Sequence, residues 1–257
     1  MFSGGAEMEK VVEMQDVSMN YHTLNGETQA IEKLSLEVLN GEFVSIVGPS
    51  GTLLSLISGI LKPSKGKILI KNEEVQGPSG NIGYMLQKDH LFEWRTIIKN
   101  VIIGLEIQGT LNKESYSFAE KLLKEYGLYE FKNHYPRQLS GGMRQRAALI
   151  RTLAANPDIL LLDEPFSALD YQTRLAISEE IWLIIKKEKK TAILVTHDIA
   201  EAISMSDRII VLTKRPAEIK FIHEITLTCE NKTPITCREA PEFRYYFNSI
   251  WKELDVH

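Results

Sequence analysis

The sequence predicts an α/β fold with a mostly parallel sheet, an antiparallel β subdomain and an inserted helical subdomain. Short apolar runs of strand length alternate with helical patterns over much of the chain, which is typical of a parallel sheet covered by helices. Residues 34–38 alternate apolar and polar side chains instead, as a half-buried antiparallel strand does. Residues from about 88 to 155 carry helical patterns alone, so we expect them to form the insertion.

The remaining elements follow from the length of each apolar run and from the turn residues beside it. Asn40 and Gly41 supply a turn after the alternating strand. The next apolar run is a buried strand, and Lys62 and Pro63 end the helix that follows it. Strands are expected at 43–47, 67–71, 82–86, 159–162, 192–196 and 208–212. Helices are expected at 52–61, 97–107, 113–126, 143–155, 173–187 and 199–205.

The composition restricts the classes of function. The 257 residues are 44% hydrophobic and 25% charged, which suits one globular domain. The net charge of −4 implies no general affinity for nucleic acid or for an anionic membrane. No apolar run reaches the roughly 18 residues that span a bilayer, and the N-terminus lacks the basic and apolar regions of a signal peptide. We therefore expect any membrane role to depend on a partner.

The chain has two cysteines, Cys229 and Cys237. They have no histidine-rich motif beside them. We interpret them as reduced cytosolic thiols, with a disulfide or a metal site as the alternatives.

Two acidic residues follow the apolar run 159–162. Ligands of open α/β sheets bind beyond the carboxyl ends of the strands, so Asp163 and Glu164 would lie at a binding edge. Asp163 suits Mg²⁺, which prefers carboxylate and phosphate oxygens. Glu164 suits the role of a general base that polarises an attacking water. The alternative is an ordinary strand that runs into an exposed acidic turn.

The segment 139–146 reads LSGGMRQR. Because Ser140, Gly141 and Gly142 are small, backbone N–H groups can approach an anion closely there, and the helix N-terminus adds favourable partial charge. The alternative is a helix start that binds nothing. The pattern favours an anion-binding segment.

Together these two segments resemble the signature and Walker B motifs of ATP-binding cassette (ABC) ATPases, a resemblance that extends over 11–216. It implies a P-loop NTPase (RecA-like) fold, ATP and Mg²⁺ as cofactors, and ATP hydrolysis as the activity. It also implies a homodimer in which Ser140, Gly141 and Gly142 of one subunit contact the γ-phosphate of a nucleotide held by the other. The chain would then be one domain with a nucleotide-binding core at 1–87 and 156–215, a helical subdomain at 88–155 and a C-terminal tail at 216–257.

Four further residues match landmarks of the family in the correct order. Gln87 matches the Q-loop glutamine, which senses magnesium, and Asp170 matches the D-loop aspartate at the dimer interface. His197 matches the switch histidine that contacts the γ-phosphate, and Tyr21 matches the aromatic residue that stacks on adenine. Each residue alone is more often a structural one, but their joint order supports the resemblance.

The phosphate loop departs from the family pattern G-x-x-x-x-G-K-[ST]. The residues that carry over as nucleotide-binding are Gly48, Pro49, Ser50, Gly51 and Thr52. The loop is about four residues short, and the phosphate-binding lysine is missing. Charge-assisted hydrogen bonds contribute roughly 1.5–3 kcal/mol each, so we expect weak nucleotide binding and little hydrolysis. An engineered null, a decayed gene, an artefact and a natural degenerate subunit are all compatible with this gap.

A narrower resemblance, to importers of nitrate, sulfonates and taurine, rests on three segments. It implies a subunit at the cytoplasmic face of the cell membrane that contacts membrane subunits directly and an extracytoplasmic solute-binding protein indirectly. Glu93 and Trp94 would then help to form the contact with the membrane subunit. The alternative is that Leu91, Phe92 and Trp94 only pack the helical insertion. The segments are GYMLQKD at 83–89, LFEWRT at 91–96 and KRPAEI at 214–219.

The sequence leaves two functions open and disfavours a third. The chain is expected to be the energy-coupling ATPase of a small-anion importer, or else a non-catalytic cassette that docks on membrane subunits or on a paralogue. A soluble ABC ATPase of DNA repair or translation is disfavoured, because the chain has one cassette and lacks sustained heptads between the phosphate loop and the signature.

Overall fold

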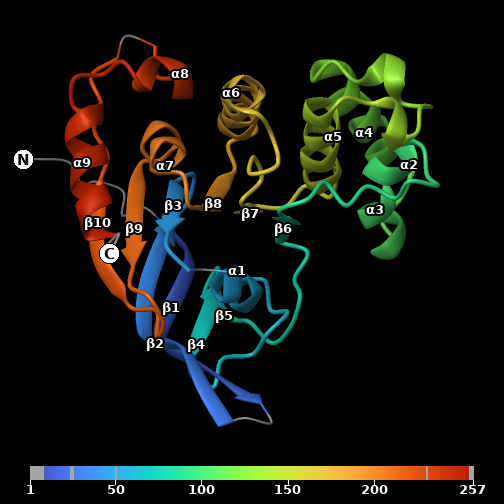
Figure 1. The fold of residues 1–257 in the computed structure, drawn as a ribbon. Helices are drawn as coiled ribbons and strands as arrows, with labels where there is room; N and C mark the ends of the chain where they lie inside the picture. Colours follow the sequence, from blue (N-terminus) through green and yellow to red (C-terminus); the bar gives the residue numbers. More distant parts are fainter. Residues whose placement is uncertain (1–8, 24–25, 50, 230, 255–257) are drawn as a thin grey trace, which may run out of the picture.

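The computed structural model describes residues 9–23, 26–49, 51–229 and 231–254 (Figure 1). Its strands are β1 Lys10–Thr23, β2 Gly26–Leu39, β3 Phe43–Val47, β4 Lys65–Ile70, β5 Glu73–Glu74, β6 Ile82–Met85, β7 Ile159–Asp163, β8 Thr191–Thr196, β9 Arg208–Leu212 and β10 Ile219–Glu224. Its α-helices are α1 Gly51–Ile57, α2 Ile97–Val101, α3 Ile103–Ile107, α4 Lys113–Glu125, α5 Gly141–Ala154, α6 Tyr171–Lys187, α7 Ile199–Met205, α8 Pro234–Cys237 and α9 Phe243–Glu253. Short 3₁₀ turns lie at Tyr129–Phe131 and Pro136–Gln138.

The central sheet confirms the predicted α/β class. Among the described residues its strand order is β10-β9-β3-β8-β7-β6, and every neighbouring pair is parallel except β10 with β9. All five residues of β3 are buried, because helices and a second sheet cover its two faces. The edge strand β10 comes from the stretch that we had assigned to the tail.

The predicted antiparallel subdomain is a second sheet of order β2-β1-β4-β5 within the described chain. We did not predict β1, and its irregularity explains why. The neighbouring residues Val11 and Val12 are both buried, and the β1–β2 register shifts at several points, including one between Met14 and Val17. Asp16 within that step has a φ of 48°. Bulges of this kind break the alternation on which strand prediction depends.

Two of the expected helices were wrong in extent. The helix expected at 52–61 ends at Ile57, and Gly59 follows it with a φ of +75°. A Cβ at Gly59 would lie 2.3 Å from the carbonyl oxygen of Gly77, so only glycine permits this turn. The helix expected at 97–107 is divided at Ile102 into α2 and α3.

The helices 88–155 form a group beside the β6 end of the central sheet (Figure 1). Helix α5 is largely buried and carries the core contacts of this group. At the opposite end, Ile250 of α9 packs with Ile203 of α7 and Ile209 of β9. The division into core, helical subdomain and tail remains a prediction.

The two cysteines are free thiols, with their Sγ atoms 3.3 Å apart. Within the described ranges, no group of three or more His, Cys, Asp and Glu side chains could hold a metal ion. Over the same ranges, no helix combines the length and apolar character that crossing a bilayer requires.

Candidate functional site

Five of the predicted site residues lie at the carboxyl edge of the central sheet. Gly48 follows β3, Gln87 is the second residue after β6, and His197 follows β8. Asp163 is the last residue of β7, and Glu164 comes directly after it. Because these strands are parallel, their ends bring residues that are far apart in sequence to one edge.

Glu164 is the centre of this group. Its Oε2 atom lies 3.2 Å from Nδ1 of His197 and accepts a hydrogen bond of 3.2 Å from Nε2 of Gln87. Glu164 has a φ of 43°, and its N–H donates to the carbonyl of Val195 at 2.9 Å. Such a backbone conformation is costly for a residue other than glycine, so the bond to β8 helps to maintain it. The three predicted residues therefore meet through one carboxylate oxygen.

Asp163 lies beside this group but has a different environment. The hydroxyl of Tyr84 donates to its Oδ2 atom at 3.3 Å. Burial raises the pKa of Asp163, and the charge of Glu164 adds to this, while the bond from Tyr84 opposes it. Burial and the charge of Asp163 in turn raise the pKa of Tyr84 to about 12. Sequence analysis did not assign Tyr84 to the site, although the pairing of β6 with β7 places it next to this strand end.

Three residues separate strand β3 from helix α1. Strand β3 ends at Val47 and helix α1 begins at Gly51; Ser50 lies outside the described residues. Gly48 has a φ of +131°, and a Cβ there would be 3.1 Å from the carbonyl oxygen of Leu212. Backbone packing against β9 therefore restricts this position to glycine.

Tyr21 reaches the first turn of α1. Its hydroxyl oxygen is 3.2 Å from Oγ1 of Thr52. A cavity of about 550 Å³ lies on another side of the loop, with Gly48, Pro49 and His197 in its wall. Tyr21 therefore lies beside Thr52, whereas His197 shares the wall of the cavity with Gly48 and Pro49 at the start of the loop.

The segment Ser140–Gly142 begins helix α5. Ser140 is the N-cap, and its Oγ accepts from the N–H of Met143 at 3.3 Å. A Cβ on Gly141 would be 3.5 Å from a methyl group of Leu169, so this segment lies next to the turn that contains Asp170. Asp170 caps α6 by accepting from the N–H of Thr173 at 3.1 Å, and hydrogen bonds from the side chain and the backbone of Thr173 lower the pKa of Asp170. The turn that leads to Asp170 is connected with Glu164, because the N–H and the hydroxyl of Ser167 donate to the carbonyl oxygen of Glu164 at 3.2 and 3.0 Å.

A buried asparagine that the sequence analysis missed organises the loop before α2. Asn100 is fully buried, and its Nδ2 donates to the carbonyl oxygens of Phe92, Arg95 and Thr96, each at 3.1 Å. Its Oδ1 accepts from the N–H of Phe92 at 2.7 Å. This loop presents Trp94 with 74% of its surface exposed, beside an exposed Glu93. Trp94 therefore lies at the surface, whereas Leu91 packs in the core of the helical group as the alternative interpretation expected.

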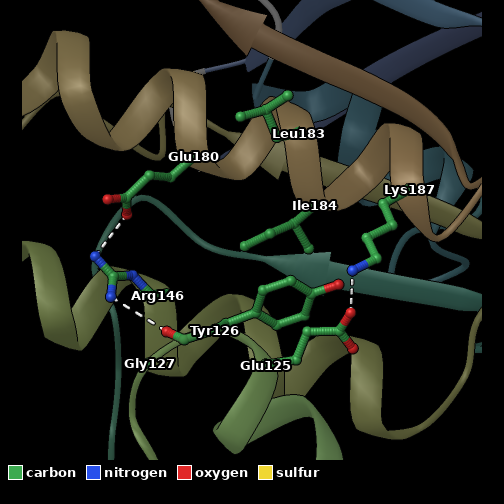
Figure 2. Close-up of a pocket in the computed structure, with 8 residues that line it drawn as sticks. All are labelled: Glu125, Tyr126, Gly127, Arg146, Glu180, Leu183, Ile184 and Lys187. Carbon is green, nitrogen blue, oxygen red and sulfur yellow. Dashed lines mark hydrogen bonds and ion pairs between the residues drawn. The ribbon is translucent and has the colours of Figure 1, made fainter.

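A second cavity, of about 310 Å³, lies between the helical group and one part of α6 (Figure 2). Arg146 of α5 pairs with Glu180 of α6 at 2.6 Å, and Lys187 of α6 pairs with Glu125 of α4. Figure 2 shows these two pairs on either side of Tyr126. None of the predicted site residues lines this cavity. The four charged side chains form two ion pairs, so the cavity lies at a junction between the helical group and α6.

Comparison with known proteins gives a consistent result. A family model described as ABC transporter matches residues 31–167. The uncharacterized ABC transporter ATP-binding protein YtlC of Bacillus subtilis is 47% identical over 93% of this chain and 94% of its own length. The nitrate import ATP-binding protein NrtD of Synechocystis is 37% identical over 93% of each chain. The taurine import ATP-binding protein TauB of Jannaschia is 39% identical over 80% of this chain and 79% of its own length.

A solved structure is similar over most of the fold. It is the dimeric structure of a post-hydrolysis state of the ATP-binding cassette MJ0796 bound to ADP and Pi. It is 33% identical with a TM-score of 0.71, and the match covers 84% of this chain and 99% of that chain.

Proposed function

Because this chain belongs to the ABC transporter family of ATP-binding subunits, we propose that it is the energy-coupling subunit of an importer for a small anion such as nitrate, a sulfonate or taurine. The observation that carries the ATPase part is the single carboxylate oxygen of Glu164 that both Gln87 and His197 contact. The names of the nitrate and taurine relatives support the importer part.

In this proposal Glu164 is the general base. It accepts the proton of the attacking water, and a carboxylate at the end of a buried strand is suited to this role. His197 contacts the γ-phosphate, and its 69% exposed side chain is accessible to a ligand. Its approach to Glu164 also holds the base in a fixed place.

Asp163 and Gln87 are the proposed ligands of Mg²⁺, which supplies charge neutralisation of the phosphates when it is bound. The residues fit this ion, because a carboxylate and an amide oxygen are donors that it accepts. Tyr84 orients Asp163 through its hydrogen bond. Tyr21 and Thr52 lie together at the start of α1, where an adenine and its phosphates would approach.

The proposed active form is a dimer. Ser140, Gly141 and Gly142 of one subunit would contact the nucleotide of the other, and Asp170 would lie at the interface. The proximity of Gly141 to Leu169 supports one shared surface for these residues. The dimeric structure of the related cassette MJ0796 supports the same arrangement.

The shortened phosphate loop makes this chain a weak nucleotide binder in our proposal. Helix α1 begins three positions after Gly48, and the loop contains no lysine. Losing two or three charge-assisted hydrogen bonds, at roughly 1.5–3 kcal/mol each, would weaken a micromolar site to roughly millimolar. The second candidate function, a non-catalytic cassette that docks on membrane subunits or on a paralogue, rests on this one observation.

The exposed Trp94 and Glu93 are the proposed contact with the membrane subunits. The buried Asn100 supports this, because its four hydrogen bonds fix the loop that presents them. The chain would then act at the cytoplasmic face of the cell membrane and respond to an extracytoplasmic solute-binding protein through the membrane subunits.

The test is a titration of Mg-ATP against this chain and against a variant with Cys-Gly-Lys-Ser inserted after Gly51, here called the restored chain. We expect micromolar binding and hydrolysis in the restored chain alone. A Glu164→Gln version of the restored chain should bind ATP without hydrolysing it. Equal affinity of the parent and restored chains would overturn the account of the loop. Failure of the restored chain to bind at all would overturn the ATPase proposal.

A further inference from the structure

Glu201 is a buried carboxylate that the proposed mechanism does not use. It lies in α7, four residues after His197, and only 2% of its surface is exposed. Its Oε2 accepts a hydrogen bond of 2.8 Å from the hydroxyl of Thr196. Burying a carboxylate is costly unless charge and hydrogen bonds compensate, so its retention at this position requires an explanation.

Arg174 of α6 supplies compensating charge together with Arg238, and Arg174 also connects three segments. Its Nε atom lies 3.8 Å from Oε1 of Glu201, and its Nη1 atom lies 3.2 Å from Oδ2 of Asp198. Its Nη2 atom donates to the carbonyl of Leu169 at 3.2 Å. A guanidinium has a rigid fork of donors, so one side chain can hold the turn before α6, the loop before α7 and α7 itself.

The loop that carries His197 is fixed on both sides of the histidine. Thr196 donates to Glu201 and accepts from the N–H of Asp198 at 3.0 Å. Asp198 caps α7 by accepting from the N–H groups of Ala200 and Glu201 at 2.9 and 3.1 Å. The imidazole of His197 is itself largely exposed. The position of His197 therefore depends on the anchored backbone beside it more than on packing of its ring.

We propose that Arg174 and Glu201 are positioning residues that hold His197 against Glu164 and couple it to the turn at Leu169 and Asp170. The role of His197 in this inference rests on the proposed function. That turn lies beside the segment Ser140–Gly142. A displacement of the turn would thus be transmitted through one guanidinium to the histidine loop.

The geometry of the Arg174–Glu201 pair predicts how variants behave. The buried Nε of Arg174 makes no hydrogen bond to any described residue, and 3.8 Å is longer than a hydrogen bond. The interaction between Arg174 and Glu201 is therefore electrostatic, whereas the simultaneous contacts of Arg174 with Leu169 and Asp198 require the branched guanidinium group. Arg174→Lys keeps the charge beside Glu201 and loses the simultaneous contacts, so it should loosen the loop without unfolding the protein.

The first measurement is amide hydrogen exchange at 197–199, together with the ring ¹⁵N shifts of His197, in the chain without nucleotide. Above pH 7, where Glu201 is ionised, Glu201→Gln and Arg174→Gln should raise exchange at these amides about tenfold, and Arg174→Lys should give a smaller increase. The ring shifts of His197 should move in all three variants. His197→Gln identifies the His197 signals among the six histidines.

Glu180→Gln is the matched control, because Glu180 lies on the same helix and forms an ion pair with Arg146 at 2.6 Å. It should leave exchange at 197–199 unchanged. Unchanged exchange and ring shifts in the Arg174→Lys and Glu201→Gln variants would overturn the proposal, as would an equal change in the control. If Arg174→Gln does not fold, the other two variants still decide the question.

A second measurement separates this inference from the proposed function. In the restored chain, Arg174→Lys should lower kcat about tenfold and leave the KM for ATP within about twofold. A purely structural role would lower the active fraction and leave kcat per active site unchanged, which would contradict the proposal. If the restored chain never hydrolyses ATP, the proposed function fails, while hydrogen exchange still tests the positioning role.

Discussion

The Nδ1 atom of His197 lies 3.2 Å from the Oε2 atom of Glu164, and Gln87 donates to the same oxygen. Residues that follow three strands far apart in the sequence thus meet at one carboxylate oxygen. A general base needs a fixed position within reach of the water that it deprotonates. In the proposed mechanism this convergence gives Glu164 such a position, so we expect each of the three residues to affect the rate.

The restored chain should therefore distinguish the base from its neighbours. Glu164→Gln should reduce kcat by about 10²–10⁴-fold, because general-base catalysis contributes that much, while ATP affinity is retained. Gln87→Ala should have a smaller effect on kcat. Steady-state hydrolysis and nucleotide titration measure the two quantities separately. A Glu164→Gln enzyme that retained more than about a tenth of the activity would show that another group is the base.

Asn100→Leu should release the loop 92–96. The substitution removes four hydrogen bonds and leaves backbone groups of the half-buried Phe92, Arg95 and Thr96 without this partner. We expect a loss of about 2–4 kcal/mol in the free energy of unfolding and faster hydrogen exchange across 92–96. Denaturant unfolding and exchange mass spectrometry measure these effects.

Asn112→Ala is the control for that experiment. Asn112 caps α4 by accepting from the N–H groups of Glu114 and Ser115, each at 2.9 Å, so its loss should cost about 1 kcal/mol. It should leave exchange at 92–96 as in the parent. Similar exchange of this loop in both variants would mean that the loop responds only to overall stability.

Gly142→Ala should disturb the packing of α5 against α6. A Cβ at Gly142 would lie 2.8 Å from Cδ1 of the buried Ile177. Overpacking should lower the free energy of unfolding by about 1–3 kcal/mol, although alanine is the better helix former. Thermal or denaturant unfolding measures this change. Adding Ile177→Val removes the clashing methyl group and should recover much of the loss.

Gly141→Ala is the matched control for this substitution. Its Cβ would meet Leu169 at 3.5 Å, an ordinary van der Waals distance, so stability should stay within about 0.5 kcal/mol of the parent. A Gly142→Ala variant as stable as Gly141→Ala would show that the helices adjust freely. The glycine at 142 would then have no packing role.

The sequence predicted the parts of this structure that depend on local patterns. Strands β3 and β9 and helix α7 have the predicted bounds, because each is an uninterrupted apolar or amphipathic run between turn residues. The bulged strand β1 was missed, and α1 was predicted too long because contact with Gly77 is not visible in a local pattern. The strand-end position of Glu164 was predictable, because parallel strands order their ends.

The supporting residues were not predictable in the same way. Tyr84, Asn100, Arg174 and Glu201 act through partners that lie far along the chain or through a loop whose shape is set by tertiary packing. An asparagine or an arginine in a helix has many possible partners, and only the fold selects one. Sequence patterns thus indicated which residues meet at the sheet edge but not which residues hold them there.

Glu201 should make the stability of the protein depend on pH in an unusual direction. Burial, the largest cause, and the charge of Asp198 raise the pKa of Glu201 from 4.5 to about 7, while Thr196, Arg174 and Arg238 oppose the shift. Between these two values the folded protein binds a proton that the unfolded chain has released. The contribution of Glu201 to stability is therefore present in full below pH 4.5 and is lost as the pH rises through about 7.

Glu201→Gln tests this dependence, because the amide has a similar shape and does not titrate. At 1.36 kcal/mol for each pKa unit, the parent should lose about 3 kcal/mol relative to the variant as the pH rises from 4.5 to about 7. Urea unfolding of both proteins at several pH values gives the difference between their free energies of unfolding. The pH dependence that other carboxylates contribute is the same in both proteins and cancels in this difference. A difference that is constant with pH would mean that Arg174 and Arg238 keep Glu201 ionised throughout. The positioning role of Arg174 would then rest on a permanent ion pair, and lowering the pH would not loosen the His197 loop.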